Sequence, residues 1–138
     1  MPTPLESHSN PPRVSKKGVR RIAILWAMII LVACLMPGKE IPQVNVPLAD
    51  KWVHFVLFGT QTILLLWSQP AGRKQIATGA FSVALFGVIV EVLQWITNPF
   101  LHRQFDVGDI AANIIGVVLG AIIFVIAQRF SNKKAAVL

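Results

Sequence analysis

The chain has 138 residues, of which 54% are hydrophobic and 14% charged, and its formal net charge is +7. A soluble domain of this length needs more polar surface, so the composition excludes an ordinary soluble enzyme and indicates an integral membrane protein. Its one cysteine, Cys34, excludes an intramolecular disulfide and any CxxC metal or redox motif. Basic residues lie at the ends of apolar segments, so we expect no nucleic-acid partner.

The N-terminal part combines a polar tail with the first apolar run. Residues 1–18 are rich in proline and end in a basic cluster, which predicts a disordered basic tail. The run Val19–Met36 follows and ends at Pro37. The segment Leu31–Cys34 also resembles a bacterial lipoprotein signal cleaved before Cys34. We prefer an uncleaved helix with a buried cysteine, because multi-span proteins rarely use that processing.

The second apolar run, Trp52–Trp67, is shorter and is interrupted by polar residues, His54 among them. A helix needs about 20 apolar residues to cross a hydrocarbon core. This run reaches that length only if Ala49–Lys51 and Ser68 belong to the same helix.

Two longer apolar runs complete the chain. Ile76–Ile96 is ended by Asn98 and Pro99, the second covers about residues 107–127, and residues 129–138 form a polar C-terminal tail. None of the runs alternates with period two. We therefore expect an all-α membrane protein, with four transmembrane helices forming a compact bundle over residues 19–128.

The basic residues predict the orientation of this bundle. Most of the 13 Lys and Arg residues lie in the two tails and in the loop around Arg73, whereas Lys39, Lys51 and Arg103 lie on the other side. The positive-inside rule then predicts that both termini are cytoplasmic.

Polar residues interrupt the apolar runs near the predicted outer surface. A charge at mid-bilayer costs roughly 2.5–3.5 kcal/mol, so such residues face a protein interior or a wet cavity and indicate function. Spacings of three or four residues put them on shared helix faces directed into the bundle. The candidate binding residues are Asp50, Lys51, His54, Glu91, Gln94, Arg103, Asp106, Asp109 and Asn113. Gly116 and Gly120 continue the last stripe as a GxxxG motif, suited to packing within the chain or to dimerisation.

Three blocks of the sequence carry a resemblance to a known family. They are Asp50-Lys51-Trp52-Val53-His54-Phe55, Glu91-Val92-Leu93-Gln94, and Arg103 to Asn113 followed by Gly116. In this order they resemble the VanZ-like family over roughly residues 37–120. The resemblance implies a small multi-pass protein of the bacterial cytoplasmic (inner) membrane and a link to resistance to the glycopeptide antibiotic teicoplanin, but no settled molecular activity. The family often has Pro-Gly before the arginine; Leu101-His102 stands here, so His102 inherits no role.

The preferred hypothesis is an outward-facing polar site that binds a membrane lipid or a lipid-linked envelope precursor. Lys51 and Arg103 would hold phosphate or carboxylate, while Glu91, Gln94 and Asn113 would bond to polar groups. Each residue also has a structural interpretation. Asp50 and Asp106 suit helix N-termini, Lys51 and Arg103 suit interfacial anchoring, His54 suits a satisfied core position, and an ion-pair network would account for the whole set.

Other functions stay open. A membrane enzyme acting on a lipid-linked substrate would use Glu91 or Asp109 with His54 as an acid/base pair, although no serine or cysteine nucleophile stands among these residues. A carboxylate and histidine set could also hold a divalent metal for a metal-assisted reaction on the same substrate. No helix carries an HExxH-like pair, however, so we expect no bound metal and no cofactor. A proton- or ion-coupled carrier would need polar groups through the whole bundle, whereas these gather near one face. The oligomeric state stays undetermined.

Overall fold

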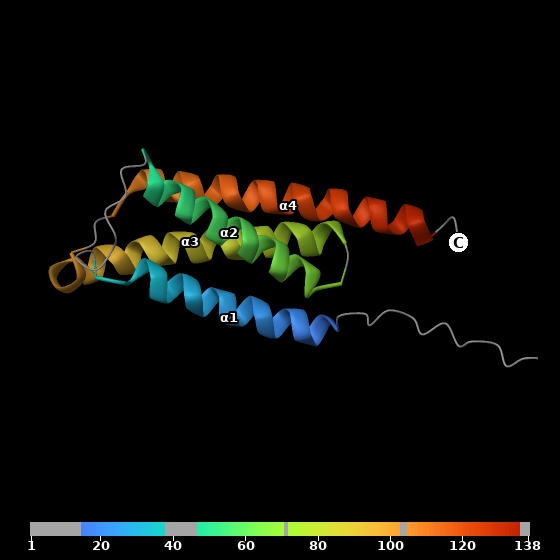
Figure 1. The fold of residues 1–138 in the computed structure, drawn as a ribbon, viewed down its shortest axis with the longest axis horizontal. Coiled ribbons are helices and arrows are strands. Elements are labelled where there is room, and N and C mark those ends of the chain that lie inside the picture. Colours follow the sequence, from blue (N-terminus) through green and yellow to red (C-terminus); the bar gives the residue numbers. More distant parts are fainter. Residues whose placement is uncertain (1–14, 38–46, 71, 103–104, 136–138) are drawn as a thin grey trace, which may run out of the picture.

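The computed structural model describes residues 15–37, 47–70, 72–102 and 105–135. These ranges form four α-helices and no strand: α1 (Lys16–Cys34), α2 (Ala49–Trp67), α3 (Arg73–Leu101) and α4 (Val107–Ala135). The helices run alongside one another, and α1 and α3 end where α2 and α4 begin (Figure 1). We call this the site end and the opposite one the basic end. The all-α prediction is confirmed.

The first two helices begin before their apolar runs. Ser15 caps α1, because its hydroxyl oxygen accepts a hydrogen bond from the Gly18 N–H at 3.1 Å. In α2 the polar residues Asp50 and Lys51 lie in the first turn, and Ser68 follows as the C-cap. The extension that the second run needs is therefore largely present in α2.

Helix α3 continues past the point where the sequence predicts its end. Pro99 lies inside the helix, which runs to Leu101. Proline lacks an N–H, so its position in the final turn costs the helix one backbone hydrogen bond near its end. His102 then ends the helix in a left-handed conformation with φ of 52°, and its N–H donates to the carbonyl of Asn98.

Helix α4 also extends beyond its apolar run, to Ala135 rather than to about residue 127. The added residues include Gln128, Arg129 and Lys133 and contain neither glycine nor proline. Such residues favour the helix, and the polar segment therefore continues α4 as a helical extension at the basic end.

Glycines bring α2 and α4 into close contact, and α4 is the helix that α2 contacts most extensively. A Cβ added at Gly116 would collide with the backbone of Phe55, and one at Gly120 would lie 2.6 Å from the carbonyl oxygen of Gly59. The GxxxG motif thus packs α4 against Gly59 of α2 within the chain. This close approach sets how near the polar residues of the two helices lie.

A small apolar core joins all four helices. Its buried members are Ile30, Cys34, Phe58, Val83, Val90 and Val117. Trp26 adds a polar tie, because its indole N–H donates to the carbonyl of Leu57 at 3.0 Å and links α1 to α2. The core lies beside the polar residues of the site end, since Val90 directly precedes Glu91 and the Cys34 carbonyl accepts a hydrogen bond from Gln94.

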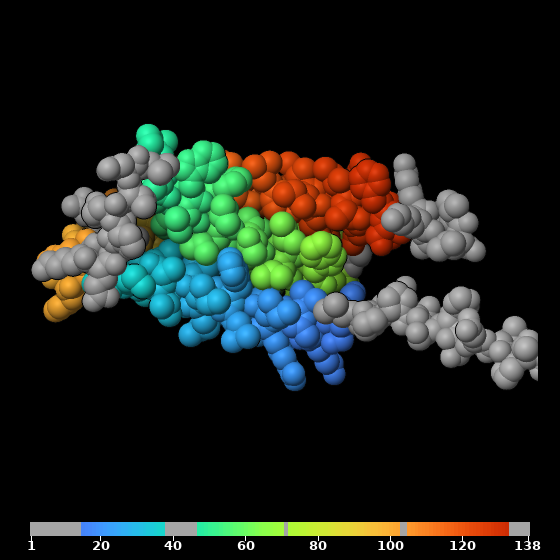
Figure 2. All heavy atoms as spheres, viewed as in Figure 1, coloured from blue at the N-terminus to red at the C-terminus, as the bar shows by residue number. Residues whose placement is uncertain are grey.

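The outer surface of the bundle is largely apolar. Large hydrophobic side chains are exposed on each helix, Leu25, Val56, Phe81 and Ile115 among them. Figure 2 shows α1, α2 and α4 closely packed across one face. Two helices are long and apolar enough to cross a membrane: α3, and α4 from Val107 to Asn132. An apolar exterior around buried polar groups suits a lipid environment.

Candidate functional site

Three helices direct polar side chains into the bundle at the site end. Helix α2 contributes from its first turns, α3 from its last third, and α4 from its first turns and the residue before it. The described residues are the buried His54, Glu91, Gln94, Asp109 and Asn113 and, at the rim of the bundle, the more exposed Asp50, Lys51 and Asp106. Arg103, the remaining sequence candidate, lies outside the described residues. The i, i+3 and i, i+4 spacing accounts for this convergence, because it keeps each group on one helix face.

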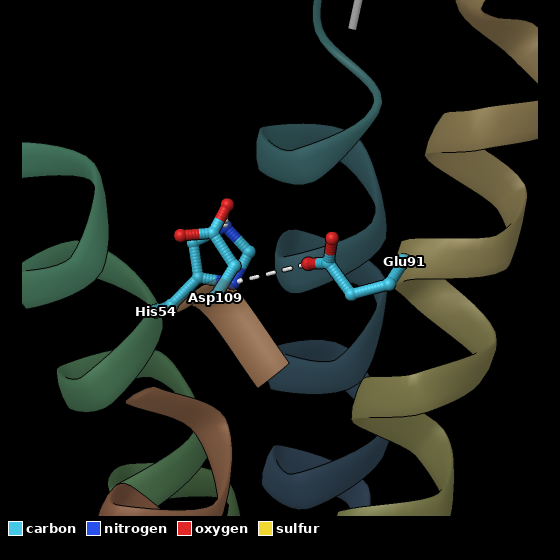
Figure 3. A group of neighbouring side chains, drawn as sticks. All are labelled: His54, Glu91 and Asp109. Atoms are coloured by element: carbon cyan, nitrogen blue, oxygen red, sulfur yellow. Dashed lines mark ion pairs between the residues drawn. The ribbon is translucent and has the colours of Figure 1, made fainter. Parts of the chain in front are cut away.

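Three buried ionisable residues, His54, Glu91 and Asp109, lie close together, and we call them the histidine centre. Their relative exposures are 2%, 0% and 7%. His54 Nδ1 lies 3.7 Å from Glu91 Oε1, and His54 Nε2 lies 3.7 Å from Asp109 Oδ2. Figure 3 shows the imidazole beside Asp109, with Glu91 reaching toward it from α3. One imidazole therefore lies between two carboxylates from two other helices.

Asn113 and Phe58 hold the imidazole in place. His54 Nδ1 lies 3.1 Å from Asn113 Oδ1, and the His54 ring stacks on Phe58 with a centroid separation of 6.3 Å. A carbonyl oxygen accepts only if Nδ1 carries a proton, so this bond leaves Nε2 facing Asp109. Asn113 Nδ2 is buried and has no hydrogen-bond acceptor among the described residues.

Lys51 is the positive centre of a second group, the lysine cluster, made of Asp50, Lys51, Asp106 and Asp109. Its ammonium nitrogen lies 2.8 Å from Asp50, 2.6 Å from Asp106 and 3.1 Å from Asp109. The sequence hypothesis has Lys51 hold the phosphate or carboxylate of a ligand. In the structure its ammonium contacts three carboxylates of the chain itself, and Asp109 joins the two groups.

Asp106 caps α4 and ties it to its neighbours. Its Oδ1 accepts from the Gly108 N–H at 2.6 Å, and its own N–H donates to Glu91 Oε2 at 3.4 Å. This capping matches the helix-terminus interpretation of Asp106. Asp50 lies in the first turn of α2 rather than at its N-cap, which is Leu48, and its carboxylate bonds mainly to the Lys51 ammonium, with the backbone N–H groups of Asp50 and Lys51 contributing. The Lys51 ammonium, helped by the Gly108 N–H, lowers the pKa of Asp106 below its ordinary value of 3.8.

The lowered pKa of Asp106 predicts acid sensitivity. Its contribution to stability is complete above pH 3.8 and is lost as the pH falls toward the lower folded-state pKa. We expect thermal stability to fall on acidification below about pH 4, and to fall less steeply in Asp106→Asn, which keeps a good capping side chain. Melting curves of detergent-solubilised protein at several pH values measure both slopes. Equal slopes would contradict a charged Lys51–Asp106 contact.

Gln94 connects the site end to α1. Its side-chain Nε2 donates to the backbone carbonyl of Cys34 at 2.8 Å, and the Gln94 side chain is fully buried. Sequence reasoning missed this role of α1, because a backbone carbonyl leaves no signal in the sequence. Cys34 itself is buried in the apolar core.

An apolar hollow lies next to the Gln94–Cys34 hydrogen bond. It has a volume of about 420 Å3 and is lined by Leu31, Val32, Leu35, Met36 and Pro37, at the end of α1. Because Leu35 directly follows Cys34, the hollow begins where α1 meets the buried polar residues. A buried polar group and an apolar recess thus lie at the same end of the bundle.

Other polar residues lie apart from this arrangement. Gln61 and Thr62 are buried farther along α2, and Thr62 donates to the carbonyl of Phe58 at 2.8 Å. Both are polar residues within an apolar run, which is the feature by which the sequence could have indicated them. The predicted site did not include them. His102 serves as the backbone cap of α3.

Comparison with known proteins identifies relatives. The family model described as VanZ/LLP1 matches residues 6–128. An uncharacterised protein of Schizosaccharomyces pombe is 27% identical over 114 residues, which cover 82% of this chain and 67% of that protein. No solved structure matches.

Proposed function

Because this chain belongs to the VanZ/LLP1 family, we propose that it is a multi-pass membrane protein whose histidine centre binds the polar headgroup of a membrane lipid. The family match agrees with the three sequence blocks that carry the resemblance. One observation supports the proposal above the others: three helices with apolar exteriors bring ionisable side chains together at one end, next to an apolar hollow.

In this proposal all four helices cross the membrane. Helices α3 and α4 meet the length and composition required, and α1 and α2 pack alongside them. Basic residues such as Arg20, Arg73 and Arg129 belong to the basic end, which supports a cytoplasmic position for that end by the positive-inside rule. The site end would then face outward, within reach of lipids of the outer leaflet.

The chemistry of the site end favours a headgroup with hydroxyl or amino groups. Carboxylates and an imidazole accept hydrogen bonds from such groups, whereas the Lys51 ammonium is already held by carboxylates of the chain. The hollow along α1 would take part of an acyl or isoprenoid chain. The headgroup and the hydrocarbon would thus each meet a matching surface.

The relative in Schizosaccharomyces pombe widens the range of lipids that are candidate ligands. A match in a eukaryote favours a ligand that is common to many membranes over a precursor restricted to bacterial walls. A lipid-linked envelope precursor fits the same proposal in a bacterial inner membrane. There, binding of such a precursor would alter teicoplanin susceptibility.

The lipid that co-purifies with the protein tests this proposal. Wild type, Glu91→Gln and Asp109→Asn are extracted in a mild detergent, and their bound lipids are quantified by mass spectrometry. We expect a specific lipid class enriched in wild type and reduced about tenfold or more in both variants, as for loss of a hydrogen bond to a charged group. Ser82→Ala is the matched control, because Ser82 is an exposed α3 residue that bonds only to the carbonyl of Thr78 within its helix. Equal lipid profiles in all four proteins would contradict the proposal.

Acid–base catalysis on the bound lipid is the second candidate. The observation that favours it is the imidazole of His54 flanked by Glu91 and Asp109, an arrangement suited to proton transfer. The same lipid analysis separates the two. A chemically altered lipid that accumulates with wild type but not with His54→Gln would favour the enzyme.

A further inference from the structure

We propose that the histidine centre is a binding site for one divalent cation of the zinc or manganese type. One nitrogen of His54 and one oxygen each of Glu91 and Asp109 lie within 4.8 Å of one another, and all three residues are buried. Each ligand comes from a different helix. An HExxH-type search within single helices therefore misses the site, and the expectation of no metal rested on that search.

The ligand set fits such a cation in chemistry and in charge. Imidazole nitrogen suits zinc and its neighbours, and carboxylate oxygen suits manganese, so a mixed set selects for these ions over Ca²⁺. Two carboxylates supply two negative charges, which match one divalent ion. Three protein ligands with a further open position is the arrangement of zinc sites that also bind water or substrate.

The geometry around His54 Nε2 gives the strongest support. In the tautomer that lets Asn113 Oδ1 accept a hydrogen bond from Nδ1–H, the lone pair at Nε2 faces the carboxylate oxygen of Asp109 at 3.7 Å. Two electron-pair donors that face each other are satisfied by a cation between them. Two metal–ligand bonds of about 2.1 Å span this separation at an angle of roughly 120°.

Asn113 provides an independent second observation. Its carbonyl orients the imidazole through the nitrogen that would not bind the metal, which is the usual outer-shell role in metal sites. Its Nδ2 is buried, with a residue exposure of 1%, and has no acceptor among the described residues. An oxygen atom of a phosphate or another extended group bound to the metal would supply that acceptor.

The neighbouring acidic set is the alternative location. Asp50, Asp106 and Asp109 also bring ligand oxygens within 4.8 Å of one another. The Lys51 ammonium contacts all three carboxylates, so a positive side chain already occupies the place that a metal ion would take. The histidine centre is therefore the better location. The proposal goes beyond headgroup binding and holds whether or not a lipid binds, although a bound cation would also attract a lipid phosphate.

Metal binding is tested on the full chain in detergent. The protein is treated with a chelator and then dialysed against Zn²⁺ or Mn²⁺ alone. We expect about one equivalent per chain in wild type, loss of saturable binding in Glu91→Gln and His54→Gln, and a 10- to 100-fold weaker affinity in Asn113→Ala. His102→Gln is the control and should bind as wild type does, because His102 belongs to neither set of possible ligands. Asp50→Asn removes a ligand of the neighbouring acidic set only, so binding that survives this substitution locates the metal in the histidine centre.

A spectroscopic measurement on wild type alone guards against variants that fail to fold. X-ray absorption of the zinc-loaded protein should show one imidazole nitrogen together with oxygen ligands at about 2.0–2.2 Å. Three results would each overturn the proposal: no saturable binding by wild type, an oxygen-only shell, or binding that is lost in Asp50→Asn but kept in His54→Gln.

Discussion

Gly116→Leu should lower the free energy of unfolding of the bundle by about 3 kcal/mol, the upper end of the range for overpacking. A side chain at Gly116 would collide with the carbonyl of Phe55 and lie 3.0 Å from the Gly59 nitrogen. Both obstacles are backbone atoms of α2, so no side-chain rotation relieves them. Chemical unfolding of the purified protein, followed by circular dichroism, measures the loss.

The same substitution should also disturb the site, because α4 carries Asp109 and Asn113 on the stripe that leads to Gly116. The matched control is Gly18→Leu in α1, where an added Cβ lies 3.5 Å from the nearest atom, the Ser15 hydroxyl oxygen. Leucine is a better helix former than glycine, so this control should be neutral or slightly stabilising. Equal stability of the two variants would show that α2 and α4 do not approach closely through these glycines.

Lys51→Met should cost about 2 kcal/mol at neutral pH, between the values for exposed and for buried ion pairs. Methionine keeps the apolar stem but leaves Asp50, Asp106 and Asp109 without their shared cation. Because protonation removes the repulsion between these carboxylates, the deficit should shrink on acidification. Unfolding curves at several pH values follow both effects.

A double-mutant cycle isolates the contact between Lys51 and the buried Asp109 in the lysine cluster. Lys51→Met combined with Asp109→Asn should cost less than the sum of the single variants, with a coupling of about 1 kcal/mol or more. Lys74→Met, an exposed residue of α3 at the basic end, should change stability by less than about 0.5 kcal/mol. Strict additivity of Lys51→Met and Asp109→Asn would contradict the contact.

The helices and the shared end of the polar residues follow from local patterns. Apolar runs predict the four helices that the described residues form, and helical spacing predicts that His54, Glu91 and Asp109 face the interior at one level. Family membership follows from the three sequence blocks. These features depend on periodicity within one segment, which a single sequence displays directly.

The partners of the polar side chains depend on packing between segments, which a single sequence does not display. Charge alone suggests Lys51 as a ligand for phosphate, yet in the structure three carboxylates surround it. The packing role of Gly116 becomes visible only when the position of Gly59 on α2 is known. The hydrogen bond from Gln94 to Cys34 likewise depends on where α1 ends in the bundle. The predicted end of α3 at Asn98 and Pro99 was wrong, because the helix continues through Pro99 and ends at the left-handed His102.

The location of the bound lipid tests the central claim most directly. The protein is reconstituted with a photoactivatable analogue of the lipid class that co-purifies with it, and the cross-linked residues are mapped by mass spectrometry. The account predicts cross-links concentrated along Leu31–Pro37 at the site end, and their loss in Glu91→Gln but not in Ser82→Ala. Cross-links spread evenly over the apolar exterior, or unchanged by Glu91→Gln, would contradict headgroup binding at the histidine centre.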